Sequence, residues 1–137
     1  EINPRASESI INSGDPFSAI HAKERLDAGA LVGILGDRAR PGDKTTRVSF
    51  LGDEAAFPLG PASLARAMRA PIFLGFGLFR GGNRYDIHIE PLADRVQVPR
   101  DRRDDALTAL VGAYATRLDH YAKLAPYNWF NFYDFWE

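Results

Sequence analysis

The feature that constrains the fold most is a long stretch of helical periodicity near the C-terminus. Between Pro99 and Pro126, apolar side chains recur at spacings of three and four, which is the pattern of one helix face. These positions are Leu107, Leu110, Val111, Tyr114, Leu118, Tyr121 and Ala125. Asp104 and Asp105 stand where acids favour a helix start, and Pro126 ends the pattern. We therefore predict a helix over 104–125 that packs one side against a core.

Shorter segments before this helix alternate between helix and strand patterns. The sequence predicts helices over 16–28 and 61–69 and strands over 30–35, 46–51, 71–79 and 84–90. The run ALVGIL at 30–35 is apolar throughout, which is typical of a strand in the interior of a sheet. Residues 71–79 and 84–90 flank an RGGN turn and read as a hairpin, whereas 53–59 is predicted as a loop. The fold class is therefore α/β, with a small mixed sheet flanked by helices.

The second strand of this hairpin alternates between apolar and polar side chains. Its faces carry Tyr85, Ile87 and Ile89 on one side and Asp86, His88 and Glu90 on the other. This alternation is typical of a half-exposed strand.

Length and charge limit the classes of protein to which the chain can belong. Its 137 residues suit one domain, and we predict a polar lead-in over 1–14 followed by a single α/β domain over 15–137. The net charge of -1 lacks the basic excess of a nucleic-acid binder. Without cysteine there is no disulfide framework and no thiolate metal site. No apolar run approaches the ~18 residues of a membrane-spanning helix.

The loop after 30–35 is the first candidate site. Asp37 and Arg38 follow the predicted strand, at the sheet edge where α/β proteins bind ligands, and Arg40 lies just beyond. Arginines there can hold phosphate, although a solvated loop with a local Asp–Arg ion pair is an equally simple reading. Gly60 begins a helix whose free N–H groups can attract anions, although an ordinary helix entry explains it as well.

The three histidines give weaker signals. His21 and Asp27 lie six residues apart in a predicted helix, ~240° around its axis, so they do not face each other. His88 and His120 lack a second ligand at metal-binding spacing, and we expect no metal site. The sequence contains neither a G-x-S-x-G nucleophile elbow nor a phosphate-binding G-x-x-x-x-G-K-[ST] loop.

The C-terminal segment YNWFNFYDFW carries seven aromatic residues in ten. It could belong to the core, to a belt at a membrane interface, or to the wall of a lipid-tail pocket. The core interpretation leads, although the interspersed Asn128, Asn131 and Asp134 make a dry core less simple.

These blocks also stand in a characteristic order. GILGDR, VSFLG, AAFPLGPASLA and APIFLGFGLFRGGNRYDIHIEPL precede a long helix that carries YATRLDHYAKLAPYNWFNFYDFW. The order resembles the C-terminal half of bacterial lipid A biosynthesis acyltransferases of the lauroyl/myristoyl type, in the lysophospholipid acyltransferase superfamily. The resemblance covers residues 16–136 and is greatest to modules fused behind a glycosyltransferase domain.

The resemblance implies an activity and its partners. Family members transfer a fatty acyl group from an acyl carrier protein or coenzyme A thioester to a lipid or glycolipid hydroxyl. They need no cofactor, and the acyl thioester is a co-substrate. The resemblance implies a peripheral location on the cytoplasmic face of the bacterial inner membrane, with the fragment itself soluble, and no nucleic-acid partner. The family's H-x4-D/E histidine is absent here, so we expect an inactive fragment with no catalytic residue of its own. The start at Glu1, with Met68 as the only methionine, fits a fragment.

Few residue roles carry over from the family. Asp37 and Arg38 match a block in which the family places polar and phosphate-contacting residues, which makes Asp37, Arg38, Arg40 and Gly60 the candidate substrate-binding residues. At Phe57-Pro58-Leu59-Gly60, many superfamily members have F-P-E-G, and Leu59 here removes the carboxylate. Ala70-Pro71-Ile72 matches the apolar block before a core strand.

Two other functions remain open. The chain could be a non-catalytic domain that binds a lipid or membrane surface through its arginine loop and aromatic tail. A hydrolase is the third reading, but no nucleophile–base–acid set is visible. An H-x4-D/E motif upstream of Asp37 would decide for the acyltransferase.

Overall fold

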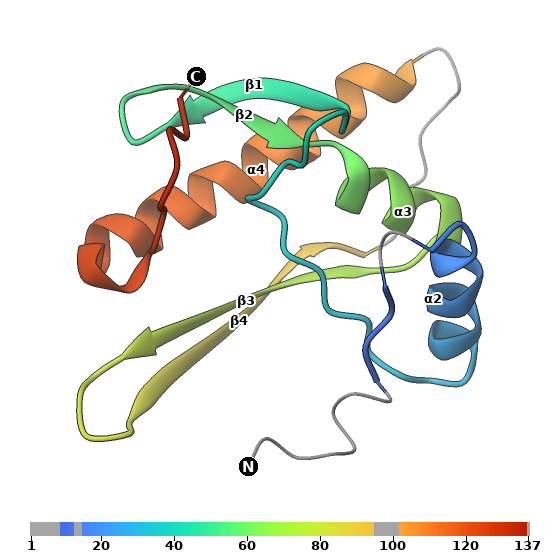
Figure 1. The fold of residues 1–137 in the computed structure, drawn as a ribbon, viewed down its shortest axis with the longest axis horizontal. Coiled ribbons are helices and arrows are strands. Elements are labelled where there is room, and N and C mark those ends of the chain that lie inside the picture. The colour runs from blue at the N-terminus through green and yellow to red at the C-terminus, as the bar shows by residue number, and fades with distance from the viewer. Residues whose placement is uncertain (1–8, 13–14, 95–101, 137) are drawn as a thin grey trace. The chain divides into compact units, whose positions relative to one another are not determined.

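The computed structural model describes residues 9–12, 15–94 and 102–136 (Figure 1). The chain divides into two units, 1–34 and 35–137. The α/β class is confirmed, because helices and antiparallel strand pairs are both present. The elements are α2 (Ser18–Asp27), β1 (Thr45–Phe50), β2 (Asp53–Pro58), α3 (Gly60–Met68), β3 (Ile72–Phe79), β4 (Tyr85–Ala93), α4 (Arg103–Leu124) and η2 (Pro126–Asn128). A single domain over 15–137 stays a prediction.

The first unit contains helix α2, close to the predicted range. The Asp15 side chain accepts a hydrogen bond from the N–H of Phe17 at 2.9 Å, so it closes the turn that leads into the helix. Gly29 ends the helix with φ at +82°, and its N–H donates to the carbonyl of Leu26 at 2.9 Å. A left-handed residue here favours glycine, because glycine has no Cβ to clash.

The prediction of a strand over 30–35 is wrong. This segment has no regular secondary structure, and Leu31 is 95% exposed. An extended segment becomes a strand only when a neighbour accepts and donates its backbone hydrogen bonds. Among the described residues, no strand pairs with this one, so its apolar composition alone does not make it part of a sheet.

The four strands form two separate antiparallel pairs rather than one mixed sheet. In the first pair, β1 runs beside β2 from Thr45 opposite Pro58 to Phe50 opposite Asp53. The predicted loop over 53–59 is therefore mostly strand. Asp and Glu disfavour strands on their own, but Phe57 reaches the core only in an extended, paired backbone.

Leu51 and Gly52 form the two-residue turn between β1 and β2, with φ at +52° and +96°. Two positive values in succession fit a tight hairpin turn. Leucine rarely adopts this conformation, but its N–H donates to the Asp119 carboxylate on α4 at 2.8 Å. The turn is thereby fixed to the long helix.

Helix α4 fulfils its prediction and organises the core of the second unit. Leu107, Val111, Leu118 and Tyr121 are buried, and Ala115 is fully enclosed. The core also takes in side chains from both strand pairs and from the C-terminal segment, including Phe50, Phe57, Leu74, Phe76, Leu78 and Phe135. One helix face thus supports both pairs.

Helix α3 and the second hairpin also fulfil their predictions. The N–H of Ala70 bonds to the carbonyl of Ala65 at 3.0 Å, and Arg69 adopts a left-handed conformation with φ at +52°. The chain then enters β3, which pairs with β4 from Phe79 opposite Tyr85. Figure 1 shows this hairpin as a ribbon separate from β1 and β2.

Candidate functional site

The Gly36-Asp37 segment is held against α4 and the C-terminal aromatic residues. A Cβ added to Gly36 would lie 3.0 Å from the Tyr114 ring, so glycine permits this close approach. The Trp129 indole N–H donates to the Asp37 carboxylate at 3.3 Å. Two blocks separated by 92 residues in the sequence therefore meet at one place.

The charge of Asp37 acts on the tyrosines around it. Burial raises the pKa of the Tyr114 hydroxyl, and the nearby negative charge of Asp37 raises it further. The pKa of Tyr133 is raised by burial first and by Asp37 second, while Arg38 opposes the shift. Both tyrosines therefore remain neutral beside the Asp37 carboxylate, and Arg38 acts on Tyr133 alone of the two.

Arg38 extends outward from this supported position. The residue is exposed, and it makes no ion pair within the described part of the chain. Arg38 is thus an exposed cation next to Asp37, whose side chain is bound by Trp129. This arrangement suits an anionic ligand, because the donors of the guanidinium can approach two phosphate oxygens together.

Arg40 has a structural role within the loop. Its N–H donates to the Asp43 carboxylate at 2.9 Å, and its Nε lies 3.6 Å from the same oxygen. The N–H of Asp43 donates back to the Arg40 carbonyl at 2.9 Å. The local Asp–Arg pair that the sequence left open is therefore present.

Gly60 lies at the start of α3, beyond β2. The preceding residue, Leu59, donates its N–H to the carbonyl of Lys44 at 2.9 Å, which ties the helix entry to the end of the arginine loop. Leu59 packs against the core, so this position contributes an apolar contact. Among the described residues, no hydrogen bond or ion pair joins Gly60 to Asp37 or Arg38.

The aromatic segment divides between core and surface. Phe135 is 4% exposed, and Trp129 and Trp136 pack against the core. In contrast, Tyr127 and Phe132 are 92% and 90% exposed. The core interpretation holds for the buried members, while Tyr127 and Phe132 lie at the surface.

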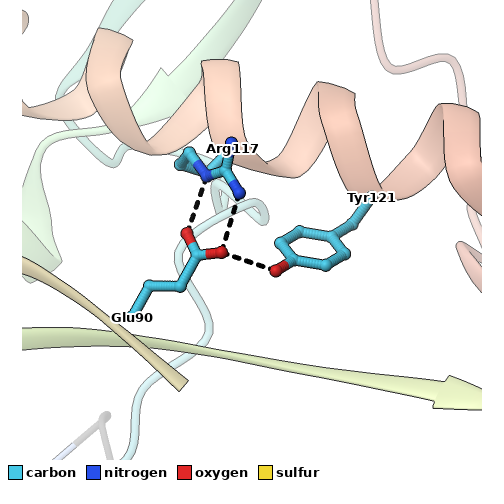
Figure 2. Close-up of polar contacts among 3 residues, drawn as sticks. All are labelled: Glu90, Arg117 and Tyr121. Carbon is cyan, nitrogen blue, oxygen red and sulfur yellow. Dashed lines mark hydrogen bonds and ion pairs between the residues drawn. The ribbon is translucent and has the colours of Figure 1, made fainter. Parts of the chain in front are cut away.

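A polar cluster between β4 and α4 was not predicted (Figure 2). Arg117 donates two hydrogen bonds to the Glu90 carboxylate, each at 2.7 Å, and the Tyr121 hydroxyl donates a third at 2.5 Å. The Arg117 hydrogen bonds, followed by the Tyr121 bond, lower the pKa of Glu90 to about 2. Carboxylates accepting several hydrogen bonds hold their charge strongly.

This cluster fastens the second hairpin to the long helix. The Arg117 guanidinium also lies 5.4 Å from the centre of the Tyr121 ring, which is within cation–π range. The spacing of four between Arg117 and Tyr121 places them on one helix face, but no sequence rule connects that face with Glu90. The cluster can therefore be found only in three dimensions.

One histidine lies beside an acid, and the other two lie against a tyrosine ring. His21 lies 3.5 Å from Asp15, while Asp27 pairs with Lys23, so the prediction that His21 and Asp27 do not face each other is confirmed. His88 and His120 each contact the Tyr121 ring. Within the described ranges, no group of three or more His, Asp or Glu residues is arranged to hold a metal ion.

Comparison of the chain with protein-family models, curated proteins and solved structures finds no match. None of the helices in the described residues has the length and apolar character needed to cross a membrane.

Proposed function

We propose that this chain is the C-terminal part of an acyltransferase domain. The domain moves a fatty acyl group from an acyl carrier protein or coenzyme A thioester to a lipid or glycolipid hydroxyl. It works at the cytoplasmic face of the bacterial inner membrane, where its lipid acceptor is found. The catalytic histidine belongs to an upstream H-x4-D/E segment that this chain does not contain.

The contact between Asp37 and Trp129 is the observation that carries the proposal. It joins the GILGDR block to the aromatic block, two of the parts on which the family resemblance rests. A family relationship gives these distant blocks a common purpose, since each helps to position Arg38 at the surface.

The roles follow from the chemistry of acyl transfer. The upstream histidine accepts the proton of the acceptor hydroxyl, whose oxygen then forms the new ester bond at the thioester carbonyl as the thiolate leaves. The carbonyl oxygen gains negative charge during this step and needs hydrogen-bond donors. Arg38 grips the phosphate of the acceptor lipid, and Asp37 orients the segment through Trp129.

The binding role can be tested with the chain itself. Calorimetric titration with dihexanoyl phosphatidic acid should show binding that Arg38→Ala weakens by at least tenfold, about 1.4 kcal/mol. Arg84→Ala is the matched control, because Arg84 is an exposed cation on the β3–β4 turn, and its loss should leave affinity unchanged. Equal effects of the two variants would contradict a specific role for Arg38.

The missing catalytic base provides a second test. With acyl thioester and lipid acceptor, the chain alone should transfer no acyl group. A longer natural polypeptide that contains this chain and the upstream motif should be active. Turnover by the chain alone that disappears in His21→Ala would contradict the proposal and make His21 the base.

The exposed aromatics favour one alternative, a non-catalytic domain that binds a membrane surface. Tyr127 and Phe132 can insert at a lipid interface, where aromatic rings are favoured. Vesicle binding that Phe132→Ala abolishes and Arg38→Ala leaves intact, in a parent protein without acyl transfer, would support this alternative.

A further inference from the structure

The β3–β4 hairpin turns an entirely uncharged face to solvent. The register places Phe73, Gly75, Gly77 and Phe79 of β3 opposite Pro91, Ile89, Ile87 and Tyr85 of β4. All eight residues are exposed. Ile89 is 70% exposed and Ile87 is 66% exposed, although isoleucine is among the residues most often buried.

The contacts on the opposite face of the hairpin determine which face is turned to the core. Leu74, Phe76 and Leu78 enter the core, and Phe76 stacks on Tyr121 with ring centres 4.2 Å apart. Glu90 lies on the same side and is bound by Arg117 (Figure 2). These contacts fix the orientation, so the isoleucine side of β4 cannot turn inward without breaking them.

We propose that this face is a self-association surface, on which two copies of the chain pack hairpin against hairpin. The five large side chains on it are exposed by fractions of 47% to 70%. At ~200 Å² for a large side chain, this represents about 600 Å² per copy. Two copies then bury about 1,200 Å², above the ~1,000 Å² expected of a specific interface. The proposal does not depend on the proposed function.

The relief of the face is self-complementary. Ile87 and Ile89 form a ridge along β4, while Gly75 and Gly77 form a low strip along β3. A Cβ added at Gly75 would meet no atom within 4 Å, whereas one at Gly77 would lie 3.5 Å from the Ile87 side chain, so the open part of the strip is at Gly75. A two-fold axis parallel to the strands sets the ridge of each copy over the strip of the other.

The hairpin edges favour a protein over a lipid bilayer as the occupant. Neither strand pairs with a third strand in the described chain, so both edges carry unpaired backbone groups. At Phe79 the edge N–H is taken up by the Asn128 side chain. Hydrocarbon offers such groups no partner, whereas face-to-face packing leaves both edges in water.

Sedimentation analysis of the chain tests the proposal. The wild type should be a dimer at micromolar concentration, and Ile87→Lys with Ile89→Lys should raise the dissociation constant at least a hundredfold. The matched control is Leu31→Lys with Ile34→Lys, which adds the same charge at positions 95% and 58% exposed. The control should remain a dimer.

Circular dichroism of the aromatic core checks that the variants fold. If the double lysine variant unfolds, Ile89→Thr keeps the β-branched shape and should still weaken the dimer. A monomeric wild type, assembly beyond a dimer, or a dimer that survives the double lysine substitution would overturn the proposal. A monomer that binds anionic vesicles through Ile87 and Ile89 would assign the face to lipid instead.

Discussion

The two hairpins of this protein differ in which of their apolar side chains are buried. Both are antiparallel pairs that lie against α4, and both contain phenylalanines. In β1–β2 the phenylalanines face inward, with Phe50 at 1% and Phe57 at 0% exposure. In β3–β4 an apolar layer faces outward as well, with Phe73 at 59%. Alternation in the sequence therefore identifies a strand but does not say which face is covered.

The attachments to α4 differ in kind. Phe50 and Phe57 meet at right angles, with ring centres 5.5 Å apart, and Phe135 packs against both. The second hairpin adds a charged fastening, in which Arg117 holds Glu90. The aromatic contacts of the first hairpin contain no ionisable group, although its turn is also bound to α4 by the Asp119 carboxylate. The attachment of the second hairpin depends on the ionised Glu90 carboxylate.

The largest expected effect comes from removing one ring from the first hairpin. Phe57→Ala should lower the free energy of unfolding by about 3–5 kcal/mol, because the ring is enclosed and leaves a cavity. Phe73→Ala, the same change on the exposed face of the second hairpin, should change it by only about 0.5 kcal/mol. Urea denaturation at submicromolar protein measures both. Equal losses of unfolding free energy in the two variants would contradict this difference between the hairpins.

The next effect concerns the close contact between Gly36 and Tyr114 of α4. Gly36→Ala should destabilise by about 1–3 kcal/mol, because the new methyl group meets the Tyr114 ring at 3.0 Å. Gly33→Ala is the control, because its Cβ would meet no atom within 4 Å. Thermal denaturation should show little change, or a small gain, for the control. A neutral Gly36→Ala would mean that the 36–38 segment is not held in this position.

A smaller effect on stability is expected from the ion pair between Glu90 and Arg117, which attaches the second hairpin to α4. Folding lowers the pKa of Glu90 from 4.5 to about 2, so its stabilisation is complete above pH 4.5 and is lost as pH falls toward 2. Glu90→Gln should therefore be less stable than the wild type at neutral pH, and the difference should shrink across that window. Glu54→Gln, at an exposed pair with Arg47, should differ little at any pH. A constant difference for Glu90→Gln would argue against the ionic fastening.

Local patterns in the sequence predicted the helices and the β3–β4 hairpin. Helix α4 follows from its apolar spacing, and the hairpin follows from the RGGN turn. The prediction of a strand over 30–35 was wrong, because a continuous apolar run does not specify a pairing partner. Strand β2 was missed because its acids suggested a loop, whereas pairing with β1 and burial of Phe57 determine its structure.

The candidate site was predicted only in part. The sequence placed Arg38 after a strand, at the carboxyl edge of a sheet, and this placement was wrong because 30–35 is not a strand. Arg38 is exposed, as predicted. Its support by Trp129 could not be predicted, because that contact spans 92 residues and depends on how the C-terminal segment folds back. The same limitation applied to Glu90 and Arg117, whose pairing depends on the placement of β4 beside α4.

The central claim is that the Asp37–Trp129 contact positions Arg38 for an anionic lipid. The chain has two tryptophans, whose indole N–H groups donate to Asp37 at 3.3 Å and to the Phe50 carbonyl at 3.4 Å. Nuclear magnetic resonance can follow both indole signals during titration with dihexanoyl phosphatidic acid. We predict a saturable shift of the Trp129 signal, little change at Trp136, and loss of the shift in Arg38→Ala or with dihexanoyl phosphatidylcholine. An unmoved Trp129 signal, or an equal shift in Arg38→Ala, would contradict the account.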